Sequence, residues 1–432
     1  MIHIYDSLTG EKRPFHKKPG ETVSFYFCGP TVYDRAHLGH GRSAVAFDWI
    51  RRALQHLGYI VDQASNITDI DDKIIERANK ENTTMAELCA RIIPIYDRDY
   101  AALKVLPPRH RPHATEYVQQ MIELIQNLEA AGAAYVLADG VYYDVASFPD
   151  YGKLSHQKLD ELQEGARVEA HKEKRNPQDF VLWKFKKEGE PFWASPWGDG
   201  RPGWHIECSA MSQALFGETL DIHGGGLDLK FPHHECEIAQ SEKVTGKSLA
   251  RFWVHNGFVT VNEEKMSKSL GNFFTLEDIF KQYHPRVVRL FLLSAHYRSP
   301  IEFSNELLDQ ARATLRRLDE AYLKASHGPK SEDFWEKVQA AIESDFDSAR
   351  ILALTFENLE NLSSSDFETL EALLGIFPAD FAVTQAQQLK ITARNKARAN
   401  RDFALSDQLR NELLEDGIEL EDGAETFVRP RV

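Results

Sequence analysis

Two short polar motifs in the chain contain the residue types that a nucleotide-handling site needs. In the first, His37 and His40 flank Gly39, so imidazole N–H donors lie beside backbone that a phosphate can approach closely. In the second, Lys265 and Lys268 lie three residues apart in a serine-rich segment and could form a positive clamp. Together, in this order, the motifs fit adenylyl transfer from ATP, in which a protein positions groups and stabilises developing charge.

Each motif by itself has an ordinary explanation. A His-x-Gly-His segment can be a solvated turn, and most Lys/Ser runs are charged surface loops. The first motif, however, stands between a predicted strand and a predicted helix, and helix N-termini attract phosphate. The pair of motifs therefore favours a triphosphate pocket over which a lysine loop closes.

A second group of residues has the chemistry of a metal site. Cys28 ends the first predicted strand, and Cys208 lies in a Gly-Trp-His-Ile-Glu-Cys segment. A Pro-His-His-Glu-Cys-Glu segment follows, and because proline suits a helix start, His233 and Glu237 would lie one turn apart on one face. Two sulfurs, one nitrogen and one oxygen make a zinc ligand set.

The spacing of these residues leaves other interpretations open. A buried free cysteine usually packs as a small hydrophobic side chain, and Cys236 could replace Glu237 as a ligand. Four protein ligands are also typical of a structural zinc site, whereas a catalytic zinc keeps an open position. Spacing alone does not decide among these possibilities.

Other polar residues surround the two motifs and the metal group. Trp204 precedes Cys208, while His223 and three consecutive glycines precede Asp228, and the glycines permit close approach of the backbone to a ligand. The acidic run after Thr68 has two interpretations of equal weight. It is either a magnesium or ribose site or a helix N-terminus with acidic first-turn residues, and it comprises Asp69, Asp71 and Asp72.

The composition limits where the protein works and what it binds. The chain has 432 residues, enough for two or three domains, and four widely spaced cysteines. It has no N-terminal signal pattern and no run of 18 apolar residues, so we expect a cytoplasmic protein that does not enter a membrane. A net charge of −15 argues against non-specific nucleic-acid binding over the whole surface. One local basic patch interrupts this acidic balance and consists of Lys390, Arg394, Lys396, Arg398 and Arg401.

The order of predicted elements in the first part of the chain indicates an α/β fold. A strand at 23–27 leads into the loop 30–41 with the His motif, then a helix that stops at Gly58 and a second strand that starts at Tyr59. This is the opening of a parallel sheet, which binds ligands at the carboxyl ends of its strands.

The later segments predict an interrupted sheet followed by helices. Helical patterns in 85–128 lead into an irregular stretch rich in Gly, Pro and Trp, and strand patterns return at 219–223 and 252–255. Beyond residue 301 the segments are helical, with breaks at 363–365 and 377–378. The predicted domains are a catalytic domain at 1–305, with an insertion at about 85–200 and the lysine-loop region at about 255–305, a helical bundle at 306–389 and a small C-terminal unit at 390–432.

These segments resemble a known family. The match covers residues 27–40, 68–73, 203–211, 221–239 and 265–274, and it resembles the class I aminoacyl-tRNA synthetases, specifically the bacterial cysteinyl-tRNA synthetases. The resemblance implies a Rossmann-type parallel-sheet catalytic domain split by an insertion, then a helical bundle and an anticodon-binding unit. It implies activation of L-cysteine with ATP and Mg²⁺ and transfer to tRNA(Cys), and we expect a monomer.

The resemblance also implies a role for individual residues. One zinc ion per chain would be held by Cys28, Cys208, His233 and Glu237, with the substrate thiolate as an additional ligand. ATP would be bound by His37, Gly39, His40, Asp228, Lys265 and Lys268, of which the two histidines and two lysines are catalytic. The amino-acid pocket would be lined by Gly29, Thr31, Thr68, Trp204 and His223, and tRNA would be bound by Arg394, Lys396, Arg398 and Arg401.

Physical chemistry supports a metal in such a site. Cysteine and serine differ by one atom, and a pocket that reads shape alone separates close analogues by about 1–3 kcal/mol. Zinc favours the thiolate and lowers the thiol pKa from about 8.5, whereas a serine hydroxyl stays protonated and binds the metal poorly. Four protein ligands need not mean a structural zinc site, because zinc can accept the substrate thiolate as a fifth ligand.

The C-terminal part matches the family less well. Residues 345–349 read Asp-Phe-Asp-Ser-Ala where the family often has Asp-Phe-Asn-Thr-Pro, and the segment 332–389 is short. Three alternatives are a ligase that delivers activated cysteine to a small amine, a synthetase-like protein without activity, and a purely structural zinc module. The intact motifs argue against the second alternative, and the basic segment near residue 390 argues against the first.

Overall fold

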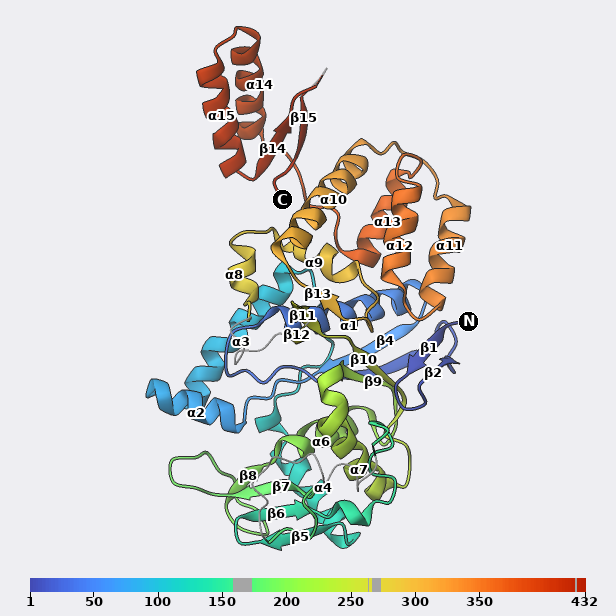
Figure 1. The fold of residues 1–432 in the computed structure, drawn as a ribbon, viewed down its shortest axis with the longest axis vertical. Coiled ribbons are helices and arrows are strands. Elements are labelled where there is room, and N and C mark those ends of the chain that lie inside the picture. Colours follow the sequence, from blue (N-terminus) through green and yellow to red (C-terminus); the bar gives the residue numbers. More distant parts are fainter. Residues whose placement is uncertain (158–172, 263, 266–272, 424–425) are drawn as a thin grey trace.

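The molecule has four tiers along its long axis (Figure 1). An antiparallel sheet lies at one end, followed by the central parallel sheet, a bundle of helices and a small C-terminal unit. No helix among the described residues is long and apolar enough to span a membrane. The computed structural model describes residues 1–157, 173–262, 264–265, 273–423 and 426–432.

The central sheet has four parallel strands in the order β10-β9-β3-β4. Strands β3 and β4 come first in the sequence among the four strands of this sheet. With the helix between them, they form the predicted strand–loop–helix–strand unit. The return of the sheet after the insertion is also confirmed, and β9 and β10 are buried along most of their length, as central parallel strands are. The elements are β3 (Thr22–Phe27), α1 (Leu38–His56), β4 (Ile60–Ser65), β9 (Leu220–Gly226) and β10 (Ala250–Asn256).

The register of the sheet brings the carboxyl ends of its strands to one edge. Phe27 at the end of β3 lies opposite Ser65 of β4 on one side and Gly224 of β9 on the other. The chain leaves β3 toward β4 through α1, whereas β9 lies on the opposite side of β3. Such a change of direction opens a crevice at the carboxyl edge, which is where this kind of sheet binds ligands.

A buried arginine joins the sheet to the helical bundle. Arg289 of α9 (Pro285–Leu293) is fully buried and donates to the carboxylate of Asp48 in α1 at 2.5 Å and to the carbonyl of Leu374 at 2.6 Å. A buried charge is tolerated when its partners are also buried and well placed. The apolar core is accordingly continuous from the sheet through α1 and α9 into the bundle.

The insertion is more regular than the sequence indicates. The stretch expected to be irregular forms a four-stranded antiparallel sheet in the order β5-β6-β7-β8. The strands are only three to six residues long, so no hydrophobic alternation develops in any of them. Gly140 is required by close approach, because a Cβ there would lie 2.2 Å from the carbonyl oxygen of Trp183. The strands are β5 (Ala134–Leu137), β6 (Gly140–Tyr143), β7 (Phe180–Phe185) and β8 (Gly200–Pro202).

The C-terminal half contains the predicted helices. It also contains a helix, α13, and a hairpin, β14–β15, that were not predicted. The expected break at 363–365 is a helix start: the Ser363 hydroxyl accepts from the backbone of Asp366, whose carboxylate accepts from the backbone of Ser363. The C-terminal unit has its own small core and ends in a hairpin. The elements are α10 (Asn305–Lys324), α11 (Glu332–Glu343), α12 (Ser348–Glu357), α13 (Ser364–Leu374), α14 (Gln385–Ala399), α15 (Phe403–Glu415), β14 (Ile418–Glu421) and β15 (Phe427–Pro430).

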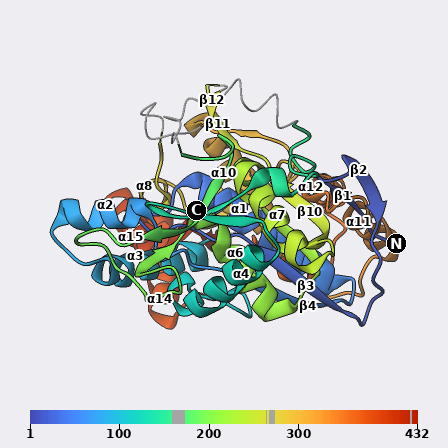
Figure 2. The ribbon, with the colours of Figure 1, turned by 90° about the horizontal axis from the view of Figure 1, so that it is seen from below.

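The remaining elements surround the central sheet. The β1–β2 hairpin and α2 lie at opposite ends of this region, as Figure 2 shows. They are β1 (His3–Asp6), β2 (Glu11–Pro14), α2 (Asp72–Glu81), α3 (Met85–Ala102), η1 (Ala114–Glu116), α4 (Val118–Ala130), η2 (Val145–Ser147), α6 (Trp204–Phe216), η3 (Leu227–Leu229), the π-helical turn η4 (Lys230–His234), α7 (Glu235–Thr245), β11 (Val259–Val261), β12 (Glu264–Lys265), α8 (Leu276–Phe280) and β13 (Ile301–Glu302).

Candidate active site and metal centre

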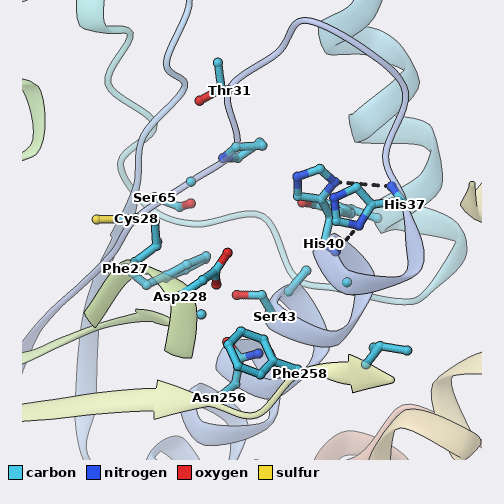
Figure 3. Close-up of a pocket in the computed structure, with 18 of the residues that line it drawn as sticks. Phe27, Cys28, Thr31, His37, His40, Ser43, Ser65, Asp228, Asn256 and Phe258 are labelled. Carbon is cyan, nitrogen blue, oxygen red and sulfur yellow. Dashed lines mark hydrogen bonds between the residues drawn. The ribbon is translucent and has the colours of Figure 1, made fainter. Parts of the chain in front are cut away.

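A cavity of about 310 Å³ lies at the carboxyl edge of the central sheet. Figure 3 shows Cys28 at one side of it and His37 and His40 at the other, with Asp228 and Asn256 lower in the view. The cavity thus occupies the crevice that the strand order creates. The expected site residues that line it are Cys28, Gly29, Thr31, His37, Gly39, His40, Trp204 and Asp228.

The two histidines of the first motif cap α1 reciprocally. The backbone N–H of His37 donates to Nδ1 of His40 at 3.2 Å, and the backbone N–H of His40 donates to Nδ1 of His37 at 3.3 Å. The rings stack with centroids 3.6 Å apart. Because each Nδ1 accepts a backbone hydrogen, the neutral ring carries its proton on Nε2. Both histidines therefore have an Nε2–H donor for an anionic ligand at this helix N-terminus.

The backbone that follows the lysine motif is attached to the His motif. The N–H of Leu38 donates to the carbonyl of Phe274 at 3.1 Å, and the N–H of Leu276 donates to the carbonyl of Ala36 at 2.9 Å. At the start of the motif, the backbone of Lys265 in β12 pairs with Thr260 of β11. Lys268 and the rest of residues 266–272 lie outside the described part of the chain. The described residues on the two sides of this gap are therefore joined by backbone pairing to β11 and to the His motif.

Four expected metal ligands converge beside the cavity. Their ligand atoms all lie within 4.8 Å of one another and come from Cys28, Cys208, His233 and Glu237. Sγ of Cys28 lies 3.5 Å from Sγ of Cys208 and 3.4 Å from a carboxylate oxygen of Glu237. Nε2 of His233 lies 3.0 Å from the same oxygen. Two sulfurs, an imidazole nitrogen and a carboxylate oxygen at such distances can hold a metal ion.

Three separate segments of the chain supply these ligands. Cys28 directly follows β3, and Cys208 lies one turn into α6. His233 is the next-to-last residue of the π-helical turn η4 and Glu237 lies in the first turn of α7, so the two are four residues apart on one face. The sequence expectation of one helical face for this pair matches their positions, although a π-helical turn rather than a regular helix precedes Glu237.

The charges inside the cluster suit a cation. Burial by itself raises the pKa of Glu237, but the imidazoles of His223 and His233 outweigh it and hold that pKa well below its usual range. Burial likewise raises the pKa of Cys208, yet hydrogen bonds from Cys28 and His233 lower it to about 6. The pKa of Cys28 is raised, chiefly by burial. The group thus combines a carboxylate, a thiol that ionises readily and a second thiol that a bound cation would ionise.

A row of histidines lies behind the ligands and was only partly expected. His223 is fully buried, with Nε2 at 2.8 Å from Glu237 and Nδ1 at 3.1 Å from the Tyr26 carbonyl, and it is not among the residues that line the cavity. His234 lies 3.3 Å from Sγ of Cys28 and 2.8 Å from His255. A second possible metal group therefore consists of Cys28, His223, His234 and Glu237. The sequence contains two adjacent histidines here, His233 and His234. Only the fold shows that their surroundings differ.

Cys236 belongs to neither metal group of the described residues. Its thiol lies 3.4 Å from the hydroxyl of Tyr151 and is buried in the apolar cluster of the insertion. Burial raises the pKa of this thiol far above its ordinary value. Cys236 therefore packs as a hydrophobic side chain, and of the two candidates only Glu237 belongs to the possible metal groups of the described residues.

Thr68 lies behind the cavity instead of lining it. Its hydroxyl donates to the carboxylate of Glu207 at 2.9 Å and accepts from the amide of Asn66 at 3.1 Å, and all three side chains are buried. The side-chain amide oxygen Oδ1 of Asn66 also accepts from the backbone N–H of Gly29 at 2.8 Å. This chain of hydrogen bonds links the segment after Cys28 to α6 next to Cys208. Sequence reasoning missed Asn66, although it directly follows the second strand.

The acidic run after Thr68 is a helix start. Asp71 caps α2 by accepting from the backbone of Lys73 at 2.9 Å, and Asp72 pairs with Lys184 and Arg201 of the insertion. The Asp69 carboxylate accepts from both the backbone and the hydroxyl of Thr115. Of the two interpretations left open by the sequence, the structure favours helix capping over a magnesium or ribose site.

The predicted basic patch separates into buried and exposed residues. Arg394 is 1% exposed, and its guanidinium makes a bidentate pair with Asp422 at 2.5 and 2.8 Å. It therefore holds the C-terminal hairpin on α14 and does not face solvent, which corrects its expected place in a tRNA-binding surface. Lys396, Arg398 and Arg401 are exposed, and Arg398 also contacts Asp422.

The fold and the site define a class of protein. Residues 14–313 match the family model described as the tRNA synthetase class I (C) catalytic domain. The solved structure of Mycobacterium tuberculosis methionyl-tRNA synthetase in complex with methionyl-adenylate superimposes with a TM-score of 0.60 at 14% identity, over 82% of this chain and 88% of that one. This likeness concerns the fold alone. The architecture is that of the class I aminoacyl-tRNA synthetases.

Closer relatives narrow the assignment. The chain is 48% identical over 447 residues to the cysteine–tRNA ligase of Legionella pneumophila (strain Corby), covering 98% of both chains. It is 47% identical over 453 residues to the cysteine–tRNA ligase of Halorhodospira halophila (strain DSM 244 / SL1), again covering 98% of both. The chain belongs to the cysteine–tRNA ligase family.

Proposed function

We propose that this protein activates L-cysteine with ATP to cysteinyl-adenylate and transfers the cysteinyl group to tRNA(Cys). The observation that carries the proposal is the double position of Cys28. It belongs to the four-donor cluster and also lines the cavity that His37 and His40 enter from the opposite side. A substrate whose sulfur binds at the cluster would thus have its carboxylate directed toward the histidine motif.

The proposed resident metal is one Zn²⁺ per chain, held by Cys28, Cys208, His233 and Glu237. Its support is the donor set, because sulfur and imidazole ligands in a compact group suit zinc better than magnesium or calcium. When bound, zinc supplies a thiophilic Lewis acid that favours a thiolate over a serine hydroxyl. Trp204, stacked on His233 at 4.2 Å, is the proposed wall of the amino-acid pocket and excludes water there.

The proposed chemistry at the ATP side is charge stabilisation by this chain's own donors. The cysteine carboxylate attacks the α-phosphorus, and the bond to the pyrophosphate oxygen breaks. Nε2–H of His37 and of His40 would donate to the phosphate oxygens as charge moves toward the leaving group. Gly39 and Asp228 would contact the nucleotide, and Lys265 and Lys268 would bind the pyrophosphate of the Mg²⁺–ATP substrate. In the second step a terminal ribose hydroxyl of tRNA attacks the carbonyl carbon and AMP leaves.

The remaining residue roles are proposed with three residues changed. Thr68 and His223 no longer line the amino-acid pocket, and Arg394 is no longer a tRNA contact. Gly29 and Thr31 stay in the proposed amino-acid pocket because they line the cavity, whereas Thr68 and His223 act from behind it. Lys396, Arg398 and Arg401 are the proposed tRNA contacts of the C-terminal unit. The proposed division of the chain is a catalytic domain at 1–305, a bundle at 306–389 and an anticodon-binding unit at 390–432.

We also propose that the protein acts as a monomer in the cytoplasm. All four cysteines are buried free thiols, and two of them are proposed metal ligands, which suits a reducing compartment. Light scattering of the purified protein with and without tRNA tests the monomer.

The decisive experiment is ATP–pyrophosphate exchange with cysteine against serine, before and after zinc removal by a chelator. We expect exchange with cysteine only, loss on chelation and recovery on adding zinc. Absence of exchange with either amino acid would overturn the proposal in favour of a protein without activity. Charging of a tRNA(Cys) transcript then separates a tRNA ligase from an enzyme that delivers cysteine to a small amine.

A further inference from the structure

A second cavity, of about 590 Å³, lies where three parts of the molecule meet. The segment 280–284 after α8 forms one wall, α10 of the bundle forms another, and α15 with the C-terminal hairpin closes it. In Figure 1 these elements surround the end of the chain. The cavity is separate from the site described above, since no residue lines both. Its cationic lining residues are Lys281, Arg312, Arg316, Arg410 and Arg431.

Three of these cations contact the C-terminal unit, one from the bundle and two from within the unit. Arg316 of α10 pairs with Glu419 of β14 at 3.0 Å, so it crosses from the bundle to the hairpin. Arg410 donates to the carbonyl of Leu420 at 3.0 Å, and Arg431 donates to the carbonyl of Leu414 at 3.2 Å. They give the cavity a fixed cationic wall.

Among the described residues, the ion pairs of the other two cations lie within their own segments. Lys281 is 63% exposed and contacts Asp278 of the same segment at 2.7 Å. Arg312 is 35% exposed and contacts Asp309 one turn earlier in α10 at 2.6 Å. Exposed pairs of this kind contribute little to stability and exchange partners easily. Both side chains can therefore turn to an anion in the cavity at little cost.

The charge of the cavity opposes the charge of the molecule. The chain carries a net charge of −15, yet five cations line this cavity against one acidic lining residue, Glu419, while Asp278 and Asp309 pair with two of the cations from outside the lining. Glu419 is itself shared between Arg316 and Arg429. A cationic hollow on an acidic protein concentrates a polyanion at one place and leaves the remaining surface repulsive to it.

We propose that this cavity binds the phosphodiester backbone of tRNA. Its lining comes from the segment after α8, from α10 and from the C-terminal unit, so an RNA that contacts this junction can reach it. Arginine forks and lysine suit phosphate oxygens, and such contacts set the register of the RNA without reading its sequence. This inference rests on the proposed function, because it assigns a further contact to the same tRNA substrate.

The test compares two double variants of the full-length protein. Lys281→Gln with Arg312→Gln removes the two lining cations whose described ion pairs lie within their own segments. Lys337→Gln with Arg350→Gln is the matched control, since it removes one exposed lysine and one exposed arginine whose described pairs are Asp333 and Glu357 in the bundle. Each protein is assayed for binding of a tRNA(Cys) transcript at several salt concentrations and for cysteine-dependent pyrophosphate exchange.

For the cavity variant we expect about tenfold weaker tRNA binding and a salt slope reduced by about 2, because each lost phosphate contact reduces it by about 1. Its pyrophosphate exchange should equal that of the control variant and of the parent protein. Equal tRNA binding and equal salt slopes in both variants would overturn the inference, as would a loss of exchange as large as the loss of binding.

Two further outcomes are distinguishable. Tripolyphosphate bound by the parent and lost in the cavity variant, with tRNA binding unchanged, would assign the cavity to a small polyanion and overturn the tRNA assignment. A parent protein that binds tRNA through the cavity but exchanges no pyrophosphate with cysteine would support the cavity and contradict the proposed function.

Discussion

Thr275 pairs with His37 across an isolated antiparallel bridge, so the residue that caps α1 is held by backbone that follows the lysine motif. The ring of Phe273 in the same segment meets the His37 ring edge-on, with centroids 5.0 Å apart. The described residues that follow the lysine motif are therefore joined to the histidine motif by hydrogen-bonded backbone. This contact orients the histidine that we propose to donate to the phosphate.

Replacing His37 should separate its capping role from its proposed catalytic role. In His37→Asn the amide oxygen can still accept at the helix N-terminus, whereas His37→Ala loses the cap and about 1 kcal/mol of stability. Both variants lack the imidazole and should lose about 10²- to 10³-fold in pyrophosphate exchange. Thermal unfolding and exchange kinetics of both variants check this. Full activity in His37→Asn would show that only the cap matters.

Glu237→Gln should remove zinc and cysteine activation together. The carboxylate lies among two thiols and three imidazoles, and the neutral amide leaves that buried group without its anion. We expect a zinc content well below one per chain, measured by atomic emission, and a large loss of exchange with cysteine.

Cys236→Ala is the matched control for this experiment, because its thiol packs against Tyr151 and lies outside both metal groups. It should keep its zinc and most of its exchange activity. A zinc content lowered in Cys236→Ala and normal in Glu237→Gln would reverse the ligand assignment.

Arg394 and Arg398 should give opposite results when each is replaced by glutamine. Arg394→Gln breaks the bidentate pair with Asp422 and should destabilise the C-terminal unit by about 2 kcal/mol. Arg398 is 50% exposed, and its replacement should leave stability within about 0.5 kcal/mol while weakening tRNA binding. Urea unfolding and tRNA titration measure the two effects. A stable Arg394→Gln variant with weakened tRNA binding would restore the expectation from the sequence.

Asp319 should make stability fall as the pH rises from about 4 to about 6. Burial raises the pKa of this carboxyl to about 6, even though Arg286 opposes the shift, and one carboxylate oxygen has no hydrogen-bond partner among the described residues. The folded state thus keeps a proton that the unfolded chain releases near pH 4, so protonation stabilises the fold below that pH and the benefit disappears by about pH 6.

The measurement for Asp319 is the free energy of unfolding in urea at several pH values for the wild type and for Asp319→Asn. The difference between the two should decline from pH 4 to pH 6 and then level off. Asp333→Asn, an exposed carboxylate of α11, controls for the loss of one negative charge. A difference that rises over this interval would contradict the expected direction.

Long patterns along the sequence predicted the central sheet well. The strand at 23–27, the helix to Gly58 and the strands near 222 and 253 are each several residues long and bounded by glycine, so local pattern and final structure agree. The insertion sheet could not be predicted in this way. Its short strands are held by pairing with one another, and Gly140 is explained only by the backbone of Trp183 opposite it.

By itself, the sequence determined the chemistry that is available: two histidines around a glycine, two lysines, and a set of sulfur, nitrogen and oxygen donors. Only the tertiary structure decided which groups meet. It placed Glu237 in the cluster and Cys236 in an apolar core, moved Thr68 and His223 behind the cavity, and paired Arg394 with Asp422. Residue types follow from the local sequence, whereas burial and partners arise from contacts between distant segments, which no local pattern contains.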